Sequence, residues 1–304
     1  MKTHAVGQII WSIKREDLID PVISGNKWRK LKYNLIEAKR RNCSTVLTYG
    51  GAYSNHILAT ASAAQQEGLN SIGVIRGEEL GLDLQSTLST NPTLAAAHAY
   101  GMQLMFVTRE EYRNLTRARN SSQLFMGNED NYEFVSNVYE IPEGGSNALA
   151  IKGCAEIIDE SCKEYDLIAV SVGTGGTLAG IVEGSYPHQE VLGFSSLKGY
   201  NHKLEIERWT SKNNWRIHDQ YHFGGYGKTT QELIQFINQF KKDHGILLDP
   251  IYTGKMMYGL FDLIRKGAFS PNTRILAIHT GGLQGIAGMN QKLAQRGALQ
   301  IEVN

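Results

Sequence analysis

The sequence predicts an α/β fold with largely parallel sheets. Short runs rich in β-branched and apolar residues alternate with longer stretches of helical pattern. Residues 44–49 precede one helical stretch and residues 71–77 follow it, while residues 274–280 lead to the last one. Such alternation is typical of βαβ units. The run at 166–172 is apolar on both faces, which indicates sheets covered by helices on both sides.

The chain length sets the domain organisation that we expect. With 304 residues, the chain can form one large or two medium domains, each with its own apolar core. The sequence has no repeat of fixed period and no low-complexity linker. We therefore expect two domains that are joined by short crossings.

The charge balance excludes some classes of partner. The 31 basic and 30 acidic residues leave a formal charge of +1, which argues against nucleic acid or an anionic membrane as the main partner. The N-terminus lacks the apolar core of a signal peptide, and no stretch reaches the ~18 apolar residues of a spanning helix. We expect a cytoplasmic protein whose cysteines, Cys43, Cys154 and Cys162, are reduced and structural.

A glycine-rich loop after residues 166–172 is the clearest candidate for anion binding. It consists of Gly173, Thr174, Gly175, Gly176 and Thr177. Glycines let backbone N–H groups turn toward a phosphate, threonines add hydroxyl donors, and the following helix adds its positive end. The alternative is a tight turn with no ligand. A dinucleotide site is disfavoured because Leu178 stands where the fingerprint needs glycine.

Two further segments hold candidate functional side chains. The segment SGNKWRKL at 24–31 places Lys27 and Lys30 at a predicted helix start, where a partly buried lysine could act as nucleophile and base. Spacing alone does not distinguish Lys27 from an ordinary solvated lysine. Ser54 and Asn55 stand at the next predicted helix start, where they either cap the helix or face a ligand.

The remaining motifs point to no metal or nucleotide site. The segment GGYGKTT at 224–230 is close to a Walker A element, but His222 replaces its first glycine. His56 and His279 have no carboxylate or second ligand at a suitable spacing, so we predict structural roles for both and no metal centre.

Six motifs in one order along the chain resemble the fold type II pyridoxal-phosphate (PLP) enzymes. The likeness is to the group of D-cysteine desulfhydrase and 1-aminocyclopropane-1-carboxylate (ACC) deaminase. The motifs are KRED (14–17), GNKWRKL (25–31), GGAYSNH (50–56), SVGTGGTLAG (171–180), DPIYTGK (249–255) and HTGG (279–282).

The resemblance implies a tryptophan synthase beta-like architecture with two open, twisted parallel-sheet domains. A large PLP-binding domain would comprise residues 1–37 and 143–304, and a small inserted α/β domain would comprise residues 38–142. The resemblance also implies a homodimer.

The resemblance assigns roles to residues that match the motifs. Lys27 would form the Schiff base with the cofactor, and Lys30 would lie near the phosphate. Asn55 would lie beside the phenolic oxygen of the cofactor, and Ser54 would face the substrate. The loop Gly173–Thr177 would hold the phosphate.

Two tyrosines and two threonines would define the substrate. Tyr226 and Tyr252 match tyrosines that reach the substrate in the family. ACC deaminases have glutamate and leucine where this chain has Thr253 and Thr280. A glutamate keeps the pyridine nitrogen protonated, as opening of a cyclopropane ring demands, whereas a threonine only hydrogen-bonds to that nitrogen. The resemblance thus implies that Thr253 and Thr280 bind the cofactor.

We therefore predict a PLP-dependent lyase with D-cysteine desulfhydrase-like β-elimination from a small amino acid, giving a keto acid and ammonia. The alternatives are an ACC deaminase and a PLP-binding protein without turnover. Tyr53, Leu58 and Leu283 depart from the family pattern and leave the shape of the substrate pocket open.

Overall fold

The computed structural model describes residues 3–118, 125–126, 133–134 and 137–303. The chain divides into two compact units, one formed by Met1–Lys30 with Ala150–Asn304 and the other by Leu31–Leu149. The segment 38–142, predicted as an inserted domain, lies within the second unit. Both units are built on parallel sheets, so the predicted α/β class is confirmed.

The first unit contains a six-stranded sheet in the order β1-β2-β12-β9-β10-β11. The strands are β1 (Thr3–Val6), β2 (Ile9–Arg15), β9 (Leu167–Val172), β10 (Glu190–Ser195), β11 (Trp215–His218) and β12 (Arg274–His279). All neighbouring strands pair in parallel except β1 and β2, which form an antiparallel pair at one edge.

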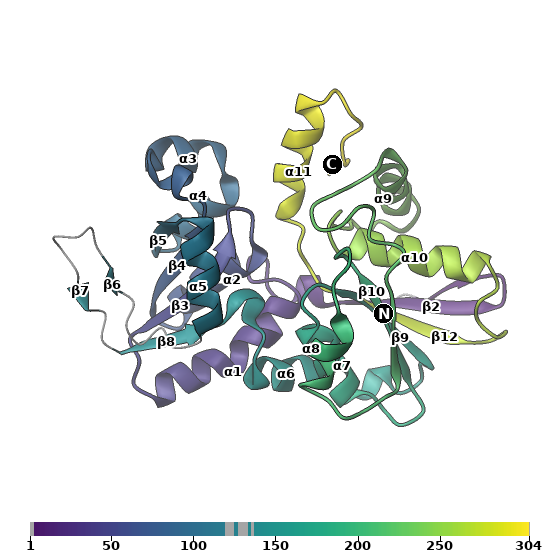
Figure 1. Cartoon of the computed structure of the whole chain (residues 1–304). Helices are drawn as coiled ribbons and strands as arrows, with labels where there is room; N and C mark the ends of the chain where they lie inside the picture. Colours follow the sequence, from purple (N-terminus) through teal and green to yellow (C-terminus); the bar gives the residue numbers. More distant parts are fainter. Residues whose placement is uncertain (1–2, 119–124, 127–132, 135–136, 304) are drawn as a thin grey trace. The chain divides into compact units, whose positions relative to one another are not determined.

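Helices cover both faces of this sheet. They are α6 (Ala148–Ala155), α7 (Gly176–Gly184), α8 (His202–Glu207), α9 (Gln231–His244), α10 (Thr253–Arg265) and α11 (Gly285–Gln295), with the short 3-10 helices η1 (Glu16–Leu18) and η4 (Glu160–Cys162). Helix α1 (Asn26–Arg40) begins in the first unit and ends in the second. In Figure 1, α9 and α10 lie on one side of the strands, and α6 and α7 lie on the other.

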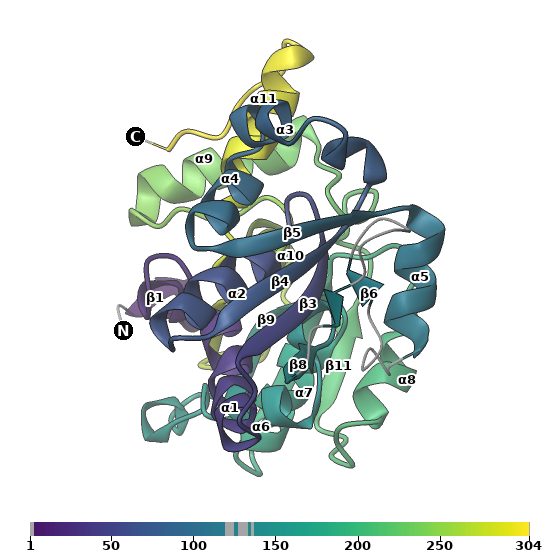
Figure 2. The same cartoon turned by 90° about the vertical axis from the view of Figure 1, so that its left-hand side faces the viewer.

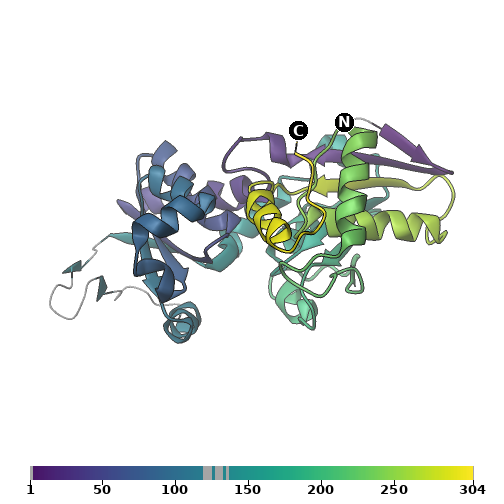
Figure 3. The ribbon, with the colours of Figure 1, turned by 90° about the horizontal axis from the view of Figure 1, so that it is seen from above.

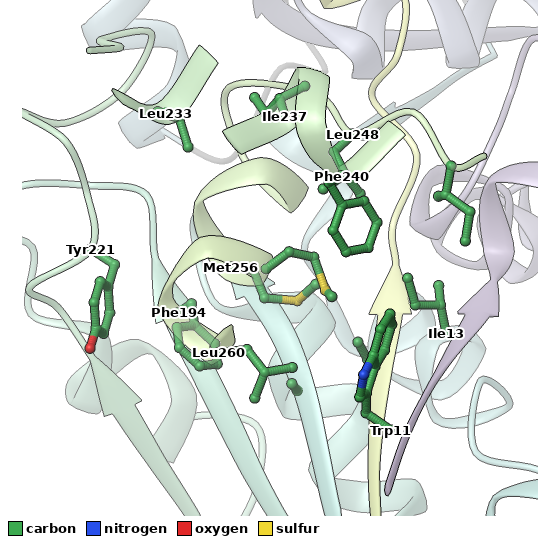
Figure 4. Packing of buried hydrophobic residues seen from close by; sticks show 14 of the residues in the cluster. Trp11, Ile13, Phe194, Tyr221, Leu233, Ile237, Phe240, Leu248, Met256 and Leu260 are labelled. Atoms are coloured by element: carbon green, nitrogen blue, oxygen red, sulfur yellow. The ribbon is translucent and has the colours of Figure 1, made fainter. Parts of the chain in front are cut away.

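Two apolar clusters fix the sheet between these helix layers. In β9, Ile168 and Val170 belong to the cluster with α6, α7 and α8, whereas Leu167 and Ala169 belong to the cluster with α9, α10 and α11. This alternation follows from the two-residue period of a strand. Figure 3 shows α9 and α10 in green and α11 in yellow over the strands, and Figure 4 shows Trp11 beside Phe240 in their cluster.

The second unit contains a four-stranded parallel sheet in the order β5-β4-β3-β8. Figure 2 shows these strands side by side. They are β3 (Thr45–Gly51), β4 (Asn70–Arg76), β5 (Met102–Val107) and β8 (Val138–Ile141). The helices are α2 (Asn55–Gln66), α3 (Leu84–Thr90), α4 (Pro92–Ala99) and α5 (Arg109–Ala118), with η2 (Glu78–Gly81) and η3 (Glu143–Gly145).

A two-residue antiparallel pair, β6 (Phe125–Met126) and β7 (Glu133–Phe134), completes the described elements. Among the helices of the described residues, none combines the length and the apolar character needed to cross a membrane.

Candidate active site

The predicted anion loop forms the turn from β9 into α7. Strand β9 ends at Val172, α7 begins at Gly176, and the N-cap residue Gly175 has a φ of 98°. Glycine adopts this left-handed backbone without the steric cost of a Cβ atom. Because glycine has no side chain, the N-cap residue cannot cap the first N–H groups of α7. This arrangement fits a phosphate, which those N–H groups and the positive helix end can bind.

The start of α1 packs against the end of β12 and against α7. A Cβ atom on Gly25 would lie 2.0 Å from the carbonyl oxygen of Thr280, so only glycine fits this contact. The Asn26 N–H donates to the same oxygen at 3.2 Å. The Asn26 Nδ2 donates to Thr177 Oγ1 at 2.7 Å. These contacts place the half-buried Lys27 in the first turn of α1, beside the start of α7.

Positive charge gathers around the buried thiol of Cys154. Lys30 is only 3% exposed, and burial lowers its pKa. Burial also raises the pKa of the Cys154 thiol, against the opposing influence of Lys30, Lys27 and a hydrogen bond with Thr177. A buried ammonium group is costly because it has lost its hydration. A phosphate near Lys30 would offset that cost, which supports the fit of a phosphorylated cofactor.

The KRED motif stabilises the same region through partly buried ion pairs. Arg29 on α1 donates to both carboxylate oxygens of Glu16, at 2.8 and 3.1 Å. Arg15 makes a two-pronged pair with Asp17 at 2.8 and 2.6 Å. Asp17 Oδ1 lies 3.3 Å from His279 Nδ1 at the end of β12. The motif therefore fixes the helix of Lys27 and the strand that leads to Thr280, a role that the sequence did not indicate.

The two predicted substrate tyrosines lie together beside the anion loop. The rings of Tyr226 and Tyr252 have centroids 6.2 Å apart at an interplanar angle of 63°. A Cβ atom on Gly173 would lie 3.2 Å from Cε1 of Tyr252. Tyr226 is 52% exposed, so its ring is open to solvent.

The two predicted threonines differ in their hydrogen bonds. Thr253 Oγ1 donates to Asp249 Oδ1 at 2.6 Å and accepts from the Asp249 N–H at 2.9 Å. Its single proton is therefore used within the start of α10. Thr280 Oγ1 instead lies 3.1 Å from the hydroxyl of Ser171 at the end of the sheet. Because either hydroxyl of that pair can be the donor, the Thr280 proton is not committed to one acceptor as the Thr253 proton is.

Ser54 and Asn55 lie in the second unit, where β3 leads into α2. Ser54 Oγ accepts from the His56 N–H at 3.2 Å, which is the predicted capping contact. A Cβ atom on Gly50 would lie 2.9 Å from Ser54 Oγ, so glycine permits this tight turn. Asn55 is the first residue of α2.

The two candidate histidines have structural partners. His56 Nε2 lies 2.8 Å from Thr48 Oγ1, and that hydroxyl donates to the Ile141 carbonyl at 2.8 Å. The His279 Nε2 lies 2.8 Å from the Leu247 carbonyl oxygen. Across the described parts of the chain, no three His, Cys, Asp or Glu side chains form a group that could hold a metal ion.

Comparison with known proteins identifies relatives over most of the chain. A family model described as pyridoxal-phosphate dependent enzyme matches residues 3–281. A putative ACC deaminase of Pyrococcus abyssi is 34% identical over 309 residues, which cover 93% of this chain and 87% of that protein. A mitochondrial bifunctional D-cysteine desulfhydrase/ACC deaminase of Arabidopsis thaliana is 32% identical, with 92% of this chain and 74% of that protein covered.

The solved structures include a similar fold. A crystal structure of an ACC deaminase homologue superposes with a TM-score of 0.72 at 30% identity, covering 94% of this chain and 88% of that one. The predicted architecture of two parallel-sheet units is thereby confirmed.

Proposed function

Because this chain belongs to the family of pyridoxal-phosphate dependent enzymes, we propose that it is a lyase that eliminates a β substituent from a small amino acid. The substrate that we propose is D-cysteine or a close analogue. D-Cysteine and water would give pyruvate, ammonia and hydrogen sulfide. The names of the relatives support an enzyme of this group.

We propose that the site residues hold the cofactor at both of its ends. Lys27 would bind it covalently through its amine, while Lys30 and the loop Gly173–Thr177 would bind its phosphate. Thr280 would donate to the pyridine nitrogen. Asn55 keeps the role that the resemblance implies, beside the phenolic oxygen. The uncapped start of α7 and the buried Lys30 support this assignment.

The chain's own groups would bind the substrate and move its protons. When bound, the cofactor withdraws electrons and thereby acidifies the Cα–H bond of the amino acid. The Lys27 amine would take that proton, and the β thiolate would leave. Tyr226 and Tyr252 would orient the substrate, and Ser54 keeps the substrate-facing role that the resemblance implies.

The choice of β-elimination rests on one observation. Thr253 and Thr280 stand at the positions where ACC deaminases have glutamate and leucine. The Thr253 hydroxyl is bound to Asp249, and the Asp249 carboxylate accepts from the N–H groups at 251–253. Thr280 can hydrogen-bond to the pyridine nitrogen but cannot protonate it. Such a weaker electron sink suits a substrate with a good leaving group, such as thiolate, better than a cyclopropane.

ACC deaminase is the second candidate, and the names of the relatives favour it. A PLP-binding protein without turnover is the third. The paired tyrosines argue against it, because a carrier does not need side chains that face a substrate.

The test combines the cofactor spectrum with a substrate screen. Wild type loaded with PLP should show visible absorbance from the lysine-bound cofactor, and should release sulfide and pyruvate from D-cysteine. Lys27→Ala should lose both properties, whereas the exposed Lys203→Ala should keep both. Release of 2-oxobutyrate from ACC at a comparable rate would support the second candidate. The absence of any keto acid from D- and L-amino acids would support the third.

We also propose a cytoplasmic homodimer with the domain division 1–37 plus 143–304 and 38–142. The motif resemblance supports the dimer, and the separate sheets of the two units support the division. Light scattering of the purified protein and cell fractionation test the assembly and the location.

A further inference from the structure

Lys255 is a fully buried lysine that the proposed chemistry does not use. It is the third residue of α10, and its side chain has 0% exposure. Burial lowers its pKa to about 8, against the opposing charge of Asp249. Lysines are rarely buried unless they are paired, because the ammonium group loses its hydration. The position of this side chain therefore calls for a structural or functional reason.

The Lys255 ammonium binds one loop at two points. Nζ donates to the His222 carbonyl at 2.9 Å and to the Gly225 carbonyl at 2.8 Å. The same two carbonyls close the turns of the loop, since they accept from the N–H groups of Gly225 at 3.0 Å and Lys228 at 3.2 Å. The Lys255 ammonium thus binds the carbonyl oxygen that closes each of the two turns.

This loop has an unusual backbone that needs support. Left-handed φ values occur at Phe223 (50°), Gly224 (90°), Gly225 (111°) and Gly227 (65°). For a residue with a Cβ atom, such as Phe223, the left-handed conformation costs about 1–2 kcal/mol. The loop has no regular strand or helix pairing. Its order therefore rests on individual contacts such as those from Lys255, the hydrogen bond from the Gly224 N–H to His222 Nδ1 and the packing of Phe223 on Tyr258.

The loop carries Tyr226 and α10 carries Tyr252. Tyr226 directly follows Gly225, the second residue that Lys255 binds. Tyr252 precedes the first residue of α10, and its N–H is held by Asp249, whose charge also acts on Lys255. Lys255 therefore connects the loop that carries Tyr226 to the helix start that follows Tyr252. The rings of these two tyrosines have centroids 6.2 Å apart.

We propose that Lys255 is a positioning residue that fixes the Tyr226 loop on the start of α10 and thereby sets the affinity for the amino-acid substrate. This inference rests on the proposed function, because it takes Tyr226 and Tyr252 as substrate contacts. A side chain that only fills the core would affect stability and leave substrate affinity alone.

The kinetic test compares Lys255→Met with wild type, both loaded with PLP. We expect the KM for D-cysteine to rise at least tenfold, with kcat within threefold and the cofactor absorbance unchanged. The affinity for D-alanine, which has no β leaving group, should fall by a similar factor in a titration of the cofactor spectrum. Lys266→Met, which removes an exposed lysine at the other end of the same helix, should change none of these.

The loop itself is tested without substrate. Lys228 is exposed within the loop, so trypsin cleavage after it reports loop opening. Lys255→Met should release the fragment that begins at Thr229 at least tenfold faster than wild type, as followed by mass spectrometry. Lys255→Gln has a shorter side chain with two N–H donors, so we expect a partial effect of about threefold on each measurement. If Lys255→Met does not fold, the same measurements on Lys255→Gln test the proposal.

A double variant links the effect to Tyr226. In a Tyr226→Ala background, Lys255→Met should add less than twofold to KM, because the side chain that it positions is gone. Unchanged KM, D-alanine affinity and cleavage in the Lys255 variants would overturn the inference, as would an effect confined to thermal stability. If wild type binds no D-alanine and does not turn over D-cysteine, the proposed function fails. The cleavage rate then decides alone whether Lys255 fixes the loop.

Discussion

The helices α7 and α10 begin in opposite ways, although both carry proposed site residues at their N-termini. At α10, the Asp249 carboxylate accepts from the N–H groups of Ile251, Tyr252 and Thr253 at 2.8 to 2.9 Å. The Asp249 carbonyl accepts from the Gly254 N–H at 2.8 Å. At α7, the N-cap residue is Gly175, which has no side chain to offer.

At α10, a side chain of the protein itself accepts from the first N–H groups, whereas the glycine N-cap of α7 leaves room for a ligand to do so. The N–H groups at a helix start need acceptors. The start of α10 finds them in one buried aspartate, which makes it a rigid support for Tyr252. The start of α7 combines glycine with nearby lysines, which is the arrangement expected of a phosphate site.

The largest effect should follow from removing the acceptor at α10. Asp249→Ala should lower the free energy of unfolding by about 3–5 kcal/mol, because three N–H groups and the Thr253 hydroxyl lose a buried partner. Denaturant unfolding of the apo protein measures this loss. Asp243→Ala, at an exposed position on α9, should cost under about 0.5 kcal/mol. A stable Asp249→Ala protein that had lost only its cofactor would mean that α10 too is a ligand site.

A smaller effect should follow from adding a side chain at α7. Gly175→Ala places a Cβ atom on a residue with a φ of 98° and should weaken PLP binding about 10- to 100-fold, with about 1–2 kcal/mol of backbone strain. Gly245→Ala is the matched control, because Gly245 is left-handed at the end of α9 and its added Cβ atom meets no atom within 4 Å. It should cost similar stability and leave PLP affinity unchanged. Equal PLP affinities of the two variants would contradict a phosphate site at α7.

The smallest effect concerns the charge beside α7. Burial lowers the pKa of Lys30 from its usual 10.5, so between that lowered value and 10.5 the unfolded chain binds more protons than the folded one. The unfolding free energy contributed by Lys30 therefore rises with pH through this window. Lys30→Met should make the apo protein more stable below the window, and its stability should rise less with pH than that of wild type.

The same Lys30→Met variant should bind PLP about tenfold more weakly, since hydrogen bonds to charged groups contribute about 1.5–3 kcal/mol. Thermal melts of both apo proteins from pH 7.5 to 10 and a PLP titration give the two measurements. A less stable apo variant with unchanged PLP affinity would show that Lys30 is only a packing residue.

The sequence alone determined the fold class and the position of the glycine-rich turn that we propose as a phosphate site. Apolar runs such as 166–172 predict buried parallel strands because side chains of a strand alternate between faces. Glycine at 175 predicts a turn into a helix because few other residues tolerate its backbone. The order of six motifs indicated the family, which spacing at Lys27 by itself could not do.

Only the tertiary structure decided which partners these residues have. Thr253 gives its proton to Asp249, four residues away in a local turn, whereas the Thr280 hydroxyl pairs with the Ser171 hydroxyl from a neighbouring strand segment, which is why we propose Thr280 as the cofactor contact. Lys255 meets carbonyls 33 and 30 residues before it, and Asn26 meets Thr177 across 151 residues. Local patterns follow from backbone geometry and periodicity, but such contacts form only once strands and helices have packed, because packing selects the partner of each buried polar group.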